Sequence, residues 1–336
     1  MDWNLFTEFI IILVSVFALT AILLRYIIPI LKSRKLGQTI KDIGPRWHKS
    51  KEGTPVMGGI GFIIAILIVL LIITAVSWFR GNVKELAPLA FAVGLAVANG
   101  MIGFVDDYCK LMKKQNEGLK AYQKYSLQLI VAAAYLVAMK LNGNLSTTLD
   151  LPFVNYTIEF SGLGLIIYYV VALLIITGVV NSVNLTDGID GLASSVTCIV
   201  GCFFAVLAFS LSFRPLGLFS AAIIGGTLGF LVYNWHPARI FMGDTGSLFL
   251  GGAVVGMAFM MNNPLIIIIA GFVYVCEAIS DIIQVGVFKL SGRKKRVFKM
   301  APIHHHFEKC GWSEIKVVTV FSIATLICCA IAYFAY

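Results

Sequence analysis

The most informative polar stretch of this chain is NSVNLTDGIDG, residues 181–191, which directly follows an apolar run. It contains Asp187 and Asp190, so a helix that begins near Thr186 would project both carboxylates from one face, beside the free N–H groups of its first turn. Carboxylate oxygens are the ligands that Mg²⁺ takes, and the N-terminus of a helix attracts anions. The stretch therefore predicts a site for phosphate and a divalent cation, with a helix N-cap and turn as the structural alternative.

A second acidic group lies in GFVDDYCK, where Asp106 and Asp107 follow one another at the end of an apolar run. Two adjacent carboxylates at a membrane boundary repel one another unless a cation compensates their charge. Lys110, on the next turn, is either that compensating charge or a contact for phosphate. A helix end with a loose ion pair is the structural alternative.

A third loop reads YNWHPARIFMGDTGS and offers the oxygen atoms of Asn234, Asp244 and Thr245 as ligands. Gly243 would let the backbone approach a ligand closely. Taken alone, GDTGS is equally typical of a helix N-cap. A third acidic loop on the same face favours the hypothesis that all three loops surround one metal and phosphate site.

Three of the five histidines are consecutive, His304, His305 and His306 in MAPIHHHFEKCGW. Consecutive side chains point in different directions, so the pattern does not predict a zinc triad. Imidazoles titrate near neutrality and can donate to phosphate or transfer protons, so we assign these three to the substrate.

Two further stretches carry polar side chains into apolar surroundings. Glu277, Asp281 and Gln284 recur on one helical stripe, which indicates either a functional site or a buried polar seam, and Gln284 is the nearest to the predicted cytoplasmic end. The segment KEGTPVMGG, with Lys51, suits an anionic substrate by its basic and glycine-rich composition. A simple loop-to-helix entry at Pro55 is the competing interpretation.

The elements that position these residues are apolar runs. With 336 residues, 59% hydrophobic and only 13% charged, the chain has the composition of a polytopic membrane protein and no room for a soluble domain. A spanning helix needs about 20 mostly apolar residues. The sequence therefore predicts an all-α membrane fold of about ten transmembrane helices in one domain, residues 1–336. The ten runs are Leu5–Leu24, Val56–Trp78, Leu86–Val105, Tyr125–Met139, Leu163–Val180, Leu192–Leu211, Leu216–Tyr233, Thr245–Met261, Leu265–Phe288 and Ile315–Ala335.

Basic residues are concentrated in alternate loops, so the net charge of +9 is interpreted as encoding topology rather than nucleic-acid binding. By the positive-inside rule both termini are outside, and anionic membrane lipids and phosphorylated substrates are the expected partners. The cytoplasmic loops are then about 32–55, 106–124, 181–191, 234–244 and 289–314, which places the active site on the cytoplasmic face.

Two smaller features complete the predicted architecture. Residues 145–160 are rich in β-branched residues and turn formers, which predicts a small external β-hairpin. Gly225 with Gly229, and Gly252 with Gly256, have the spacing of close helix contacts, either within the chain or at the seam of a homodimer.

Together these motifs resemble the polyprenyl-phosphate N-acetylhexosamine-1-phosphate transferase superfamily, and within it the branch that transfers phospho-MurNAc-pentapeptide. The resemblance covers nearly the whole chain and is carried by KEGTPVMGGI, NGMIGFVDDYCK, GLKAYQK, NSVNLTDGIDGLA, YNWHPARIFMGDTGS and MAPIHHHFE. The last motif discriminates most, because relatives that transfer N-acetylglucosamine phosphate carry a differently spaced histidine motif. Val56 departs from the family, which commonly has threonine there, and removes any hydroxyl contact from that position.

The resemblance implies an Mg²⁺-dependent enzyme of the bacterial cytoplasmic membrane that transfers phospho-MurNAc-pentapeptide from UDP-MurNAc-pentapeptide to undecaprenyl phosphate, giving lipid I and UMP. It also implies catalytic roles for Asp106, Asp107 and His304, and a magnesium ligand at Asp244. The positions that it places around nucleoside and sugar are Lys51, Asn184, Asp187, Gly188, Asp190, Phe241, Gly243, Gln284 and His305. The residues themselves add Lys110, Asn234 and His306 to the predicted substrate site.

The sequence leaves open two mechanisms and two other functions. The reaction proceeds either through an aspartyl-phosphate intermediate or by direct attack of the lipid phosphate on the β-phosphorus of the donor. Direct attack is favoured, because a phosphate monoester with a second pKa of about 6 is mostly dianionic at neutral pH, and Asp106 would deprotonate the remainder. The other functions are a sibling transferase for UDP-N-acetylglucosamine and a transporter or lipid flippase, whose site would lie near the bilayer midplane.

Overall fold

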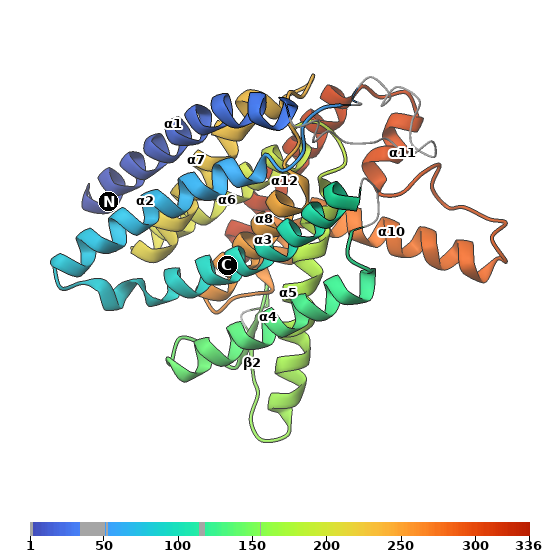
Figure 1. Ribbon diagram of the computed structural model, residues 1–336. Helices are drawn as coiled ribbons and strands as arrows, with labels where there is room; N and C mark the ends of the chain where they lie inside the picture. Colours follow the sequence, from blue (N-terminus) through green and yellow to red (C-terminus); the bar gives the residue numbers. More distant parts are fainter. Residues whose placement is uncertain (1–2, 34–50, 52, 114–117, 155) are drawn as a thin grey trace.

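The computed structural model describes residues 3–33, 51, 53–113, 118–154 and 156–336. Most of the first predicted cytoplasmic loop, about 32–55, lies outside the described residues, as do residues 114–117 of the second loop and Asn155 of the predicted hairpin. The described chain forms a bundle of long helices with one short two-stranded sheet (Figure 1).

The elements alternate long helices with short connections. The first half consists of α1 (Trp3–Ser33), α2 (Gly59–Phe79), the 3₁₀ turn η2 (Val83–Leu86), α3 (Ala87–Lys113), α4 (Ala121–Leu141), β1 (Thr148–Leu151), β2 (Tyr156–Glu159) and α5 (Gly164–Thr186). The second half consists of α6 (Leu192–Ser210), α7 (Arg214–Asn234), α8 (Gly243–Met260), α9 (Ile266–Ala270), α10 (Phe272–Leu290), α11 (Ile303–Lys309) and α12 (Glu314–Ala335).

Among the described residues, nine helices are long and apolar enough to cross a membrane, which confirms the prediction of an all-α membrane fold. The predicted run at 265–288 is the exception, because it is not one helix. It divides at Gly271 into the short α9 and the longer α10. Glycine is a poor helix former, which accounts for the division, and α10 carries three charged residues, Glu277, Asp281 and Lys289.

The predicted β-hairpin is present. Strands β1 and β2 are antiparallel, with Thr148 opposite Glu159 and Leu151 opposite Tyr156. The hairpin follows the C-terminal end of α4, and a helix of 21 residues is about 30 Å long, close to the thickness of the hydrocarbon core. Residues at the N-terminal end of α4, such as Lys124, therefore lie about one bilayer thickness away from the hairpin.

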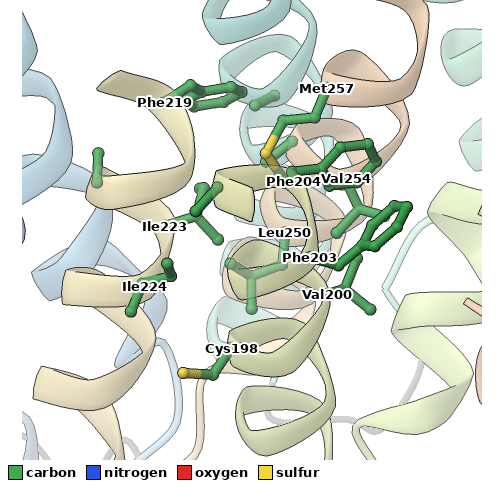
Figure 2. Packing of buried hydrophobic residues seen from close by; sticks show 14 of the residues in the cluster. Cys198, Val200, Phe203, Phe204, Phe219, Ile223, Ile224, Leu250, Val254 and Met257 are labelled. Carbon is green, nitrogen blue, oxygen red and sulfur yellow. The ribbon is translucent and has the colours of Figure 1, made fainter. Parts of the chain in front are cut away.

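Helix α8 is the central helix, because nearly all of its side chains are buried. Leu250, Val254 and Met257 form one stripe along it. Figure 2 shows this stripe packed against Phe203 and Phe204 of α6, with Ile223, Ile224 and Phe219 of α7 beside them. The packing fixes the position of α8, and with it the loop residues at its N-terminal end.

Both glycine pairs pack within the chain. Side chains at Gly225 and Gly229 would meet residues of α1, and side chains at Gly252 and Gly256 would meet Ala96 and Ala92 of α3. This supports the intramolecular interpretation of their spacing. An interface between two copies of the chain would have to use other surfaces.

The prediction that a helix begins near Thr186 is wrong. Thr186 is the last residue of α5, and α6 begins only at Leu192, so Asp187 and Asp190 lie in a turn between two helices. Gly191 has a φ of 77°, a left-handed conformation that L residues with side chains rarely adopt. The turn therefore separates the two carboxylates, which a helix would have placed on one face.

Candidate active site

Asp107 joins α3 to the N-terminus of α8. Its carboxylate accepts the backbone N–H groups of Asp244, at 3.2 Å, and Thr245, at 2.9 Å, and the Thr245 hydroxyl at 2.7 Å. These N–H groups belong to the first turn of α8 and have no partner within that helix. A side chain at Gly103, one turn before Asp107, would collide with the backbone carbonyl of Asp244, so α3 and α8 approach closely here.

Asp106, like Asp107, lies on a helix because α3 continues about two turns past the predicted end of its apolar run, through Lys113. Asp106 Oδ1 accepts the backbone N–H of Leu119 at 2.7 Å, and Oδ2 lies 2.6 Å from Lys110 Nζ. Both carboxylates are buried. Their positions on a rigid helix are thus set by the helix itself and by the segment that leads into α4.

Three carboxylates converge at this junction. Asp106, Asp107 and Asp244 each offer an oxygen atom, and these atoms all lie within 4.8 Å of one another. Lys110 Nζ lies 2.8 Å from Asp244 Oδ2, and Lys124 Nζ lies 3.0 Å from the same oxygen. We call these three aspartates, with Lys110 and Lys124, the acidic centre.

Asn184 connects the acidic centre to α5. Its amide nitrogen donates to Asp244 Oδ1 and to Ser247 Oγ, both at 2.8 Å, and its amide oxygen accepts from Lys124 Nζ at 3.4 Å. Gly243, which opens α8 with a φ of 72°, lies against Asp107, whose carboxylate a side chain at this position would meet. The structure thus brings six predicted site residues together: Asp106, Asp107, Lys110, Asn184, Gly243 and Asp244.

Asp187 adds a fourth carboxylate to this region. Burial raises the pKa of its carboxyl well above the ordinary value, and the charges of Asp244, Asp107 and Asp190 raise it further. Within the described part of the chain, no hydrogen bond reaches its side chain. Because its ionised form is unfavourable here, a cation bound nearby would stabilise that form.

The acidic centre fits a divalent cation. It and Asp187 bring four carboxylates together against the two ammonium groups of Lys110 and Lys124. The carboxylates outnumber the ammonium groups, so a divalent cation beside them would favour their ionised forms. Clustered carboxylate oxygens are the donor set of hard cations such as Mg²⁺. Asp106, Asp107 and Asp244 are the residues that would hold it.

A second charged cluster lies on the other side of the 187–190 turn. Lys51 Nζ lies 2.7 Å from Asp190 Oδ1 and 2.6 Å from Glu314 Oε2, while Asp190 Oδ2 lies 2.9 Å from His236 Nδ1. Glu314 also accepts the backbone N–H of Asp190 at 3.2 Å. We call these four residues the lysine cluster.

Glu314 and His236 were not among the predicted site residues. A lone glutamate in the first turn of a membrane helix is typical of an ordinary dipole interaction, and HPAR carries no spacing signal. Only the fold shows that both residues contact Asp190.

Asn234 and Phe241 hold loops together. Asn234 accepts the Gly191 N–H at 3.1 Å and donates to the Ile240 carbonyl at 2.9 Å. The Phe241 backbone accepts from the Gly58 N–H at 2.8 Å and donates to the Pro55 carbonyl at 2.9 Å. These bonds fix the loop between α7 and α8 against the segment that follows Lys51.

The three histidines have different surroundings. His304 is fully buried, and its Nδ1 lies 3.0 Å from Glu277 Oε2 of α10. Its Nε2 faces Gly188, where an added side chain would collide with it. His305 Nδ1 lies 2.6 Å from Glu308 Oε2. His304 therefore borders the 187–190 turn.

His306 and Gln284 have contacts elsewhere. The imidazole of His306 accepts the Lys299 N–H at 3.1 Å. The Gln284 amide donates to the Phe298 carbonyl at 2.9 Å and accepts the Val297 and Phe298 N–H groups, both at 3.0 Å. Gln284, predicted to contact a ligand, thus holds the segment between α10 and α11, and α10 itself extends away from the other helices on the right of Figure 1.

Comparisons with known proteins agree on one group of relatives. The profile of glycosyl transferase family 4 matches residues 88–262, which include the acidic centre. A protein of Clostridium botulinum (strain Eklund 17B / Type B), named phospho-N-acetylmuramoyl-pentapeptide-transferase, is 48% identical over 322 residues, 95% of this chain and 94% of the relative. Relatives with the same name from Clostridium acetobutylicum and Acetivibrio thermocellus are 49% and 45% identical, over 91% and 95% of this chain and 92% of each relative.

We expect Asp187→Asn to stabilise the protein in the absence of divalent cations. An acid whose pKa is higher in the folded than in the unfolded state binds more protons when folded, so its contribution to stability is greatest below its ordinary pKa and is lost as pH rises through the raised pKa. Melting temperatures in detergent with EDTA should therefore be higher for the variant, by more at neutral pH than in mild acid. Asp150→Asn in the hairpin is the control, and an equal or lower melting temperature of Asp187→Asn at neutral pH contradicts the prediction.

Proposed function

This chain belongs to glycosyl transferase family 4 and, within it, to the phospho-N-acetylmuramoyl-pentapeptide-transferases. On that premise we propose that it transfers phospho-MurNAc-pentapeptide from UDP-MurNAc-pentapeptide to undecaprenyl phosphate. The products are lipid I and UMP. The reaction is the first membrane step of peptidoglycan synthesis.

The observation that carries the proposal is the convergence of three separate segments on the turn at 187–190. The acidic centre combines α3 and the start of α8, the turn at 187–190 contributes Asp187, and His304 from α11 packs against Gly188. Carboxylates, ammonium groups and an imidazole in one place suit phosphoryl transfer, which depends on positioning and charge neutralisation. A lipid-phosphate acceptor requires such a site at the membrane boundary.

In the proposed site, Asp106, Asp107 and Asp244 would hold Mg²⁺. When bound, the cation would neutralise charge on the diphosphate of the donor and on the leaving UMP. Lys110 and Lys124, which already contact Asp244, would donate to phosphate oxygens of the substrates. His304 borders the substrate at the 187–190 turn.

We favour direct attack by the lipid phosphate on the β-phosphorus. Asp106 accepts hydrogen bonds from the Lys110 ammonium and the Leu119 N–H, which hold its oxygens in place. The acceptor, a phosphate monoester with a second pKa of about 6, is mostly dianionic at neutral pH and needs little activation. Asp106 then serves to remove a proton from the remaining monoanion.

The lysine cluster suits the nucleoside end of the donor. Asp190 is anchored by Lys51 and by the Ala238 N–H at 3.0 Å, so its position is rigid. Carboxylates and an ammonium group can pair with the hydroxyl and imide groups of uridine. Phe241 and Gly188 would line the same end, and His305 would face the lactyl-peptide.

The site is proposed to face the cytoplasm in a bacterial inner membrane. Its loops carry most of the lysines and arginines, whereas the hairpin at the far end of α4 carries none. The exposed residues Arg293–Arg296, after the protruding α10, would meet the phosphates of anionic lipids. Both termini would then lie outside.

The topology predicts which introduced cysteines react in intact cells. Val154→Cys in the hairpin should react with a membrane-impermeant maleimide, because its side chain is exposed on the outside. Lys295→Cys should react only after the cells are permeabilised, and the unmodified protein gives the background of its own seven cysteines. The reverse pattern would place the site on the outer face.

The metal proposal predicts that EDTA abolishes UMP release by the purified enzyme and that added Mg²⁺ restores it. Asp244→Asn should need more Mg²⁺, because one carboxylate of the acidic centre is lost. Asp150→Asn, in the distant hairpin, is the matched control and should keep the Mg²⁺ dependence of the unmodified enzyme. Turnover at an unchanged rate in excess EDTA would reject a metal-dependent mechanism.

The donor proposal predicts that, with undecaprenyl phosphate and Mg²⁺, UMP is released from UDP-MurNAc-pentapeptide and much less from UDP-N-acetylglucosamine. Both donors share uridine and diphosphate, so the acidic centre and the lysine cluster cannot discriminate between them. Discrimination must come from elements that meet the lactyl-peptide, and the α11 segment is the best candidate. His305→Ala and His306→Ala should therefore lower transfer of the MurNAc donor, whereas Asp106→Ala should abolish turnover.

Two outcomes of this assay would overturn the donor proposal. Equal rates with both donors would favour the sibling transferase for N-acetylglucosamine phosphate. Absence of UMP from either donor, with protein that elutes as a single species, would favour a transporter or flippase.

A further inference from the structure

The buried pair of Glu277 and His304 is a feature that the proposed reaction does not yet explain. The two side chains come from α10 and α11, both are 0% exposed, and Nδ1 lies 3.0 Å from Oε2. A carboxylate is expensive to bury, even beside a partner. Because one member of the pair lies beside the proposed substrate site, the cost of burying it suggests that the pair has a function there.

The hydrogen bonds of the pair define the tautomer of the imidazole. Glu277 Oε2 also accepts the backbone N–H of His304, at 3.4 Å, so this oxygen acts as an acceptor. In the neutral imidazole, His304 Nδ1 then donates its proton to Oε2, which leaves the lone pair on Nε2. The fixed tautomer is the one in which the far nitrogen can accept.

The far nitrogen points to the 187–190 turn. His304 Nε2 is buried and has no hydrogen-bond partner among the described residues, and it lies against Gly188. A buried polar atom without a partner costs free energy. An atom of this kind beside a candidate site is available to a bound substrate.

We propose that Glu277 is a positioning residue, which holds His304 in the Nδ1–H tautomer so that Nε2 accepts a hydrogen bond from the substrate at the Asp187–Gly188 turn. Glu277 would touch no substrate itself. The inference rests on the proposed function for the identity of that substrate. It rests on the geometry of the pair for the tautomer.

Asp281 provides a matched control. It lies one turn further along α10, and no hydrogen bond or ion pair reaches its side chain from the described part of the chain. If a carboxylate on this stripe were needed only as part of a polar seam, replacement of Asp281 and Glu277 should have similar effects. If Glu277 positions His304, only changes at Glu277 should alter the imidazole.

The test combines nitrogen NMR of ¹⁵N-histidine-labelled full-length protein with steady-state kinetics. The His304 signals are assigned as those that disappear in His304→Gln. Glu277→Gln keeps a hydrogen-bond acceptor without the charge, Glu277→Leu removes both, and Asp281→Leu is the control. An unchanged KM for the donor, and elution as a single species, establish that each variant is folded.

We expect His304 in the unmodified protein to be the Nδ1–H tautomer. Glu277→Gln should keep that tautomer with a partial loss of kcat. Glu277→Leu should give a mixture of tautomers and lower kcat on the order of 10²-fold, the lower end of general acid–base contributions, at an unchanged KM. Asp281→Leu should leave the tautomer and kcat unaltered.

Three results would overturn the proposal: a proton on Nε2 in the unmodified protein, a lower kcat of Glu277→Leu with an unaltered tautomer, or the same changes in Asp281→Leu. The first measurement uses the unmodified protein, so a proton on Nε2 overturns the proposal even if a Glu277 variant does not fold. The NMR readout needs no substrate. A failure of the donor assay would thus refute the proposed function without deciding the tautomer.

Discussion

The structure of the site depends on a carboxylate of one membrane helix that caps the N-terminus of another. Asp107 of α3 accepts the N–H groups of Asp244 and Thr245, which begin the central helix α8. α8 is buried along nearly its whole length, so these N–H groups have little water available to them. The cap satisfies them, and it also brings the carboxylate of Asp244 beside those of Asp106 and Asp107. A requirement of the fold and the assembly of the acidic centre are therefore met by the same contact.

The protein's own positive groups balance the negative charge of the acidic centre and Asp187 only in part. The N-terminus of α8 carries a partial positive charge, and Lys110 and Lys124 contribute two ammonium groups, but Asp187 has no hydrogen-bond partner in the described part of the chain. Residual negative charge in a buried site costs stability, and a cation or the phosphates that it carries would recover this cost on binding. Natural sites commonly sacrifice stability for function in this way.

Much of the fold could be predicted from the sequence, because long apolar runs have few alternatives in a membrane. The limits of elements could not. Hydropathy does not register that α3 continues as a helix through Lys113, because charged residues form helices as readily as apolar ones. The spacing of Asp187 and Asp190 suits a helix, but Gly191 adopts a left-handed conformation, which interrupts a right-handed helix. Glu314 and His236 were missed because their contacts with Asp190 cross more than 40 residues of chain.

The turn at 187–190 gives the site its two ends. On a helix, Asp187 and Asp190 would share one face and one ligand. In the turn, Asp187 lies near the charges of the acidic centre, while Asp190 is bound by Lys51 and His236 of the lysine cluster. His304 packs against Gly188, between the two aspartates, and reaches it because α11 is tied to α10 through Glu277. A donor with a nucleoside at one end and a diphosphate in the middle needs such a division, since each end must meet its own charged groups at a fixed separation.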